Sequence, residues 1–144
     1  MTKPIVVAFD GSDAGRRAVS LAADLAGSSG ATLVVAHVLE WSPYSFLTQE
    51  ELHERHKRRA QEVSRAEQAL VQPVVDDLTA RGLNATGEIR YGHVAETLVE
   101  IAQAHNAGQI VIGRLGAGGL SARLFGSVAG TLAQIAPVPV TIVP

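Results

Sequence analysis

Short runs of consecutive apolar residues alternate along the chain with segments in which apolar residues recur at helical spacing. The apolar runs predict strands at residues 4–9, 31–38, 85–90, 109–112 and 138–143. Consecutive apolar positions suit strands that are buried on both faces. The first of these strands, PIVVAF, begins almost at the N-terminus.

Helices are predicted between the strands. Ser12 is a candidate N-cap, and Ala18, Leu21, Ala22 and Leu25 follow it at helical spacing until the sequence GSSG at residues 27–30 ends the helix. The same spacing returns at residues 94–102 and 128–135. Alternating strands and helices predict an α/β fold, a doubly wound and mostly parallel sheet with helices on both faces.

Residues 42–81 differ from the rest, because they hold half of the acidic and half of the basic residues of the chain. Interleaved charges favour a solvated helix face with pairs such as Glu54–Arg58 and Glu51–Arg55. Pro73 lies inside this pattern, so we expect either a kink or a second helix that starts near it.

His53 and His56 stand three residues apart in the same segment. Surface histidines are the favoured interpretation, and a shared metal ion is the alternative, which lacks a third ligand at fixed spacing.

Length and composition favour one domain over residues 1–144, with a net charge of -2 and no cysteine. This charge gives no reason to expect nucleic acid as the main partner. No apolar run approaches the roughly 18 residues of a membrane span. The N-terminus has no signal-peptide pattern, and we expect a cytoplasmic protein.

The stretch GRLGAGGLSARLFGS at residues 113–127 follows a predicted strand and leads into a predicted helix. Ligands of doubly wound sheets bind at the carboxyl ends of the strands, and a glycine-rich loop before a helix N-terminus suits a phosphate. A phosphate cradle is therefore one interpretation of this loop, and a plain connector is the other.

Other classes of phosphate- or nucleotide-binding protein fit this sequence poorly. The chain has no glycine-lysine pair for a P-loop, and the dinucleotide spacing fails at Ser121. A receiver-like phosphoacceptor lacks the expected lysine near the last strand, because the only lysines are Lys3 and Lys57. A flavodoxin-like FMN protein lacks an obvious aromatic pair.

The spacing from Gly113 through Gly116 to Gly126-Ser127 resembles the nucleotide motif of the ATP-binding subgroup of the universal stress protein family. The opening Asp10-Gly11-Ser12 is similar to the start of that family as well. The resemblance spans the whole chain and implies a five-stranded parallel sheet in the order 3-2-1-4-5.

The resemblance also implies a site for ATP, or for ADP or AMP. Asp10 is expected on the ribose or adenine side, and its alternative role is to cap the turn before the first helix. Mg²⁺ or Mn²⁺ is expected to bridge the phosphates, with no side-chain ligand. The alternative for Arg114 is a plain exposed arginine. The implied nucleotide-binding residues are Ala8, Asp10, Val38, Ile112, Gly113, Arg114, Gly116, Gly126, Ser127 and Val128.

No histidine, glutamate or lysine lies within residues 113–127 to act as a base. We therefore predict a regulatory protein of the stress response that binds a protein partner and hydrolyses ATP slowly at most. The alternative is a nucleotide-free interaction module. The apolar last strand would form an exposed edge, and the resemblance implies a homodimer that pairs this edge through Val138, Val140 and Ile142.

Overall fold

The computed structural model describes residues 2–40, 48–115 and 127–144. Its centre is one five-stranded sheet in which every neighbouring pair is parallel, in the order β3-β2-β1-β4-β5. The predicted fold class and strand order are therefore confirmed. The strands are β1 (Ile5–Ala8), β2 (Leu33–Glu40), β3 (Ala85–Gly92), β4 (Gln109–Gly113) and β5 (Val140–Val143).

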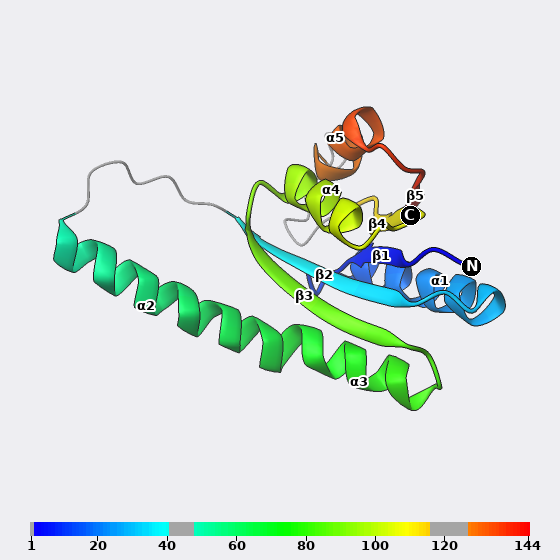
Figure 1. The fold of residues 1–144 in the computed structure, drawn as a ribbon, viewed down its shortest axis with the longest axis horizontal. Coiled ribbons are helices and arrows are strands. Elements are labelled where there is room, and N and C mark those ends of the chain that lie inside the picture. Colours follow the sequence, from blue (N-terminus) through cyan, green and yellow to red (C-terminus); the bar gives the residue numbers. More distant parts are fainter. Residues whose placement is uncertain (1, 41–47, 116–126) are drawn as a thin grey trace.

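Helices cover both faces of the sheet (Figure 1). One face carries α1 (Asp13–Ser29) and α3 (Gln72–Ala80), and the other carries α4 (Val94–Ala104) and α5 (Ser127–Ile135). Successive residues of a strand point to opposite faces, so Val7 packs under α1 while Val6 packs under α4. Two apolar layers result, one on each side of the sheet.

The first helix begins where its cap predicts. Ser12 has an extended backbone, and its hydroxyl accepts a hydrogen bond from the Gly15 N–H. The helix runs through Gly27 and ends at Gly30, which adopts φ 77° and donates its N–H to the Ala26 carbonyl. A left-handed glycine is the usual helix stop, because it carries no Cβ.

The charged segment forms one long helical arm (Figure 1). It consists of α2 (Gln49–Ala66), a π-helical segment η1 (Glu67–Val71), and α3. Pro73 lies in the first turn of α3, so of the two expected alternatives, a kink or a second helix that starts near Pro73, the structure has the second. Proline cannot donate a hydrogen bond inside a helix, and the π-helical segment ends at Val71, two residues before Pro73.

α2 contributes no buried residue. Thr48 and Glu51 form a capping box at its start, so Glu51 serves the cap of this helix. The predicted pair Glu54–Arg58 is present at 3.7 Å, and both side chains are exposed. Because α2 buries no side chain, its position depends on the few contacts that it makes with the sheet.

Several strand boundaries differ from the predicted ones. β2 starts and ends two residues later than expected, and β3 extends to Gly92 because it pairs with β2 along its whole length. The expected last strand at 138–143 is wrong at its start, since β5 begins at Val140. Pro137 and Pro139 precede it, and neither has an N–H for a ladder. Val138 therefore lies outside the strand.

Among the helices of the described residues, none combines the length and the apolar character that a membrane crossing requires.

Candidate functional site

The candidate site lies at the carboxyl ends of β1 and β4, which are neighbours in the sheet. From β1 the chain leaves to the face that carries α1, and from β4 it goes on to α5 on the opposite face. This reversal of winding is a topological switch point, the usual place for a ligand in a doubly wound sheet. Asp10 follows β1 and Gly113 ends β4, so the pairing of these two strands brings the two predicted residues to one end of the sheet.

Asp10 is engaged in the turn before α1. Its Oδ1 accepts hydrogen bonds from the Ser12 N–H, at 2.9 Å, and from the Ser12 hydroxyl. The Ser12 oxygen in turn accepts from the Gly15 N–H at 3.0 Å. The structure thus contains the capping arrangement that was the alternative interpretation of Asp10. Its contact with a ribose or adenine stays a prediction.

Gly113 has a packing reason to be glycine. A Cβ added there would lie 2.8 Å from both the Cβ and the carbonyl carbon of Ala14. Real Cβ atoms essentially never approach so closely, and the backbone of α1 cannot yield as a flexible side chain can. The first turn of α1 thus lies directly on the end of β4. This requirement is independent of any phosphate.

The backbone of Gly113 faces the end of β1. Ile110 donates its N–H to the Pro139 carbonyl and Arg114 donates to Val143, so even-numbered residues of β4 face β5. Successive residues of a strand alternate in direction, and Gly113 therefore directs its N–H and C=O toward β1. The pairing of β1 with β4 ends at Val7 and Val111, one rung earlier.

The backbone of Val38 faces the same point from the other side. Ile5 and Phe9 donate to Thr32 and Ala36 of the β2 side, so even-numbered residues of β2 face β1. β1 ends before Val38 is reached, and Val38 belongs to the part of β2 that extends past it. Polar backbone groups of Val38 and Gly113 thus flank the position just beyond the end of β1.

The apolar members of the predicted set lie on one face of the sheet. Ile112 is buried in the layer under α4 and α5, and Ala8, Val38 and Val128 pack against that layer as partly buried residues. The fold therefore brings these four side chains to one side of the switch point. Such an apolar wall is the surface that a flat base requires.

The structure describes only some of the residues predicted to bind the phosphates. Arg114 has an exposed side chain next to Gly113. Ser127 begins α5, and Gly116 and Gly126 lie outside the described residues. Within residues 2–40, 48–115 and 127–144, no group of three or more metal-binding side chains occurs. His53 and His56 are exposed on α2.

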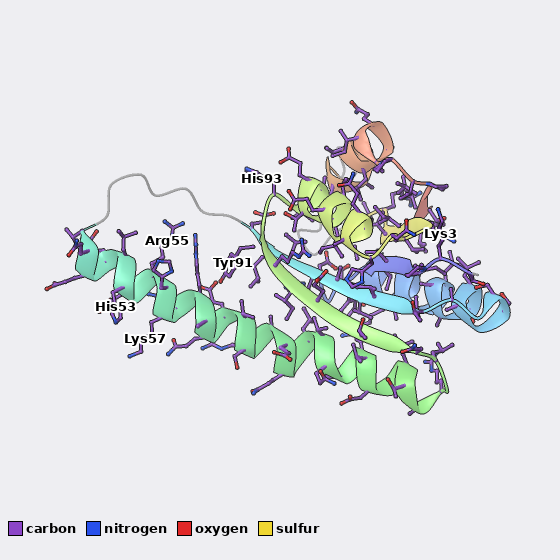
Figure 2. All side chains as sticks on the ribbon, in the orientation of Figure 1. Lys3, His53, Arg55, Lys57, Tyr91 and His93 are labelled. Carbon is purple, nitrogen blue, oxygen red and sulfur yellow. The ribbon has the colours of Figure 1, made fainter. Side chains whose placement is uncertain are left out.

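Sequence reasoning missed the contact that holds α2 to the sheet. Tyr91, near the end of β3, points toward α2 (Figure 2). Its hydroxyl donates a hydrogen bond to the Glu62 carboxylate, and the Arg59 guanidinium lies 5.1 Å from the centre of its ring. Partial burial and the neighbouring Glu62 raise the pKa of Tyr91 to about 12. No local pattern marks this contact, because its partners lie about thirty residues apart.

The universal stress protein family model matches residues 1–144. This chain belongs to the universal stress protein family. It is 32% identical to a universal stress protein from Thermus aquaticus, over 99% of this chain and 99% of that protein. A universal stress protein from Mycobacterium tuberculosis is 29% identical over 97% of this chain, which spans 47% of that longer protein.

Solved structures of universal stress proteins have the same fold. The protein UspA from Lactobacillus plantarum is 25% identical, with a TM-score of 0.83 over 99% of this chain and 97% of that chain. A universal stress protein solved in complex with cAMP is 26% identical, with a TM-score of 0.70 over 99% of this chain and 96% of that chain.

Proposed function

We propose that this universal stress protein binds an adenine nucleotide at the switch point between β1 and β4. The observation that carries the proposal is the likeness to the universal stress protein solved with cAMP, which is 26% identical over nearly the whole chain. Adenine nucleotides are therefore the ligand class to test first. The predicted cytoplasmic location, where these nucleotides are abundant, fits this function.

The geometry supports an assignment of parts to the ligand. Ala8, Val38 and Ile112 supply an apolar wall for the base. We assign the backbone of Gly113, the exposed Arg114 side chain and the N-terminus of α5 to the phosphates. A helix N-terminus favours anions, and Mg²⁺ or Mn²⁺ would bridge the phosphates. ATP, ADP and AMP have the same base and differ in the number of phosphates, so the residues assigned to the phosphates determine which of the three binds most tightly.

We further propose that the nucleotide acts as a regulatory signal for a protein partner, with slow hydrolysis at most. A contact inside the molecule supports this role. A Cβ added at Gly11 would lie 2.9 Å from the Leu70 Cδ1, so the turn that carries Asp10 lies against η1. Since η1 follows α2 without a break, we expect a change at the site to affect this helix, which has no buried residue.

A homodimer through the edge of β5 is part of the same proposal. Pro139 and Val143 accept hydrogen bonds from β4, so by alternation the N–H and C=O groups of Val140 and Ile142 point outward. The Ile142 side chain is 40% exposed. Outward-pointing backbone groups and an apolar side chain on one edge strand favour pairing with a second copy.

Titration calorimetry with ATP, AMP, cAMP and adenosine tests the nucleotide site. We expect Arg114→Gln to weaken ATP binding by about threefold to tenfold while it leaves adenosine binding unchanged, because we assign this side chain to the phosphates alone. Arg58→Gln, an exposed arginine of α2, is the matched control. If the unaltered protein, purified free of nucleotide, binds none of the four ligands, the proposal fails. The interaction module then becomes the better interpretation.

A further inference from the structure

At the end of the ladder between β1 and β2, a side chain donates a hydrogen bond where a backbone amide would normally do so. In a parallel pair, every second residue of a strand bonds to both neighbours of the residue opposite it. Phe9 lies one position past the paired residues Ala8 and Ala36, and its N–H donates to the Ala36 carbonyl at 2.9 Å. The next rung of a regular ladder would run from the Val38 N–H to the Phe9 carbonyl.

That rung is replaced by a side chain. The Nδ1 atom of His37 lies 2.8 Å from the Phe9 carbonyl oxygen. A carbonyl oxygen only accepts, so Nδ1 carries the hydrogen and donates it. In the part of the chain that the structure describes, no hydrogen bond joins the Val38 N–H to Phe9. The Phe9 carbonyl thus receives the imidazole N–H at the point where a regular ladder would bring it the Val38 amide.

The consequence falls on the candidate site. Val38 directs both its N–H and its C=O toward the end of β1, because even-numbered residues of β2 face that strand. Because no hydrogen bond among the described residues joins the Val38 N–H to Phe9, these two groups form an adjacent donor and acceptor at the switch point. The edge of adenine offers an acceptor at N1 and a donor at the N6 amino group. Guanine offers the two in the reverse order.

We propose that His37 is a positioning residue that keeps the Val38 amide available for N1 of adenine. The inference rests on the proposed nucleotide site and names how that site chooses its base. His37 itself stays on the other face of the sheet, since odd-numbered residues of β2 point toward α1, as Leu33 and Val35 do. It touches no ligand and acts only through Phe9 and Val38.

The test compares ATP with 1-deaza-ATP, which lacks the N1 acceptor, on three proteins. The unaltered protein should bind ATP about tenfold more tightly than 1-deaza-ATP, as expected for the loss of one buried hydrogen bond. In His37→Leu the Val38 amide can close the ladder onto Phe9, so ATP binding should fall about tenfold and the difference between the two ligands should vanish. His37→Asn keeps a donor near the Nδ1 position and should preserve both the affinity and the difference.

Amide hydrogen exchange of the unaltered, ligand-free protein gives a second measurement that needs no variant. The Val38 amide should exchange much faster than the Ala36 amide, which lies within the paired part of the ladder. Equal protection of the two amides would overturn the inference, and so would an unchanged ligand difference in a folded His37→Leu. Failure of the unaltered protein to bind ATP at all would instead overturn the proposed nucleotide site.

Discussion

Gly113, the last residue of β4, lies directly against Ala14 in the first turn of α1, and a Cβ at position 113 would stand 2.8 Å from the Ala14 Cβ. Ninety-nine residues separate the two positions in the chain (113 minus 14). The contact fixes the helix N-terminus at the switch point, beside the residues predicted to hold a nucleotide.

We expect Gly113→Ala to destabilise the protein by about 1–3 kcal/mol, because the added methyl group overpacks a contact with backbone atoms. Denaturant unfolding measures the change. Gly27→Ala is the matched control, since Gly27 lies within α1 and an added Cβ there meets only the Leu83 Cδ2 at 3.9 Å. Alanine should stabilise that position by roughly 0.5–1 kcal/mol. A Gly113→Ala variant as stable as the unaltered protein would contradict the packing role.

The two capped helices should respond differently to loss of their caps. Ser12→Ala should cost about 1 kcal/mol of unfolding free energy, because α1 contributes several buried residues to the core. Thr48→Ala removes the equivalent cap from α2, which contributes none. We therefore expect it to increase hydrogen exchange in the first turns of α2 and to leave global unfolding nearly unchanged. Equal losses of global stability in the two variants would contradict this contrast.

The pKa of Tyr91 predicts a dependence of stability on alkaline pH. Its burial and Glu62 raise the pKa from 10.0 to about 12 in the folded state, so the folded protein holds this proton more tightly than the unfolded chain. The resulting stabilisation is fully present below pH 10 and is lost as the pH rises toward about 12.

Tyr91→Phe should remove this part of the pH dependence and increase exchange along α2, because the hydrogen bond to Glu62 disappears. Unfolding measured across this pH range checks the stability, and tyrosinate absorbance of the two proteins gives the pKa by difference. An unshifted Tyr91 pKa would show that the hydrogen bond from Tyr91 of β3 to Glu62 of α2 is absent in solution.

Ile142→Lys should shift the proposed dimer toward monomer, because a lysine on an exposed edge strand opposes pairing with a second strand. We expect the dimer dissociation constant to rise at least about tenfold, as measured by sedimentation. Leu52→Lys makes the same change at an apolar side chain of α2 that is also 40% exposed, and should leave the association unchanged. A protein that sediments only as a monomer at micromolar concentration before any substitution would defeat the dimer itself.

Much of this architecture could be read from short-range patterns. The alternation of apolar runs and helical spacing predicts all five strands and the helices between them, and Ser12, Gly30 and Pro73 mark helix boundaries where the structure has them. These features depend on φ, on a missing N–H, or on a cap three residues away, so neighbouring residues determine them. The start of β5 was missed because Pro139, which has no N–H for the ladder, interrupts an apolar run that begins at Val138.

The sequence by itself thus determined the class of fold, the order of the elements and, through its likeness to a family, the place of the candidate site. Only the tertiary structure decided why Gly113 must be small, how Tyr91 holds α2, and which backbone groups face the switch point. The hydrogen bond from His37 to Phe9 belongs to the same group. Each of these contacts joins residues that are far apart in the chain. No local propensity encodes which distant atoms will meet when the strands pair and the helices pack on the sheet.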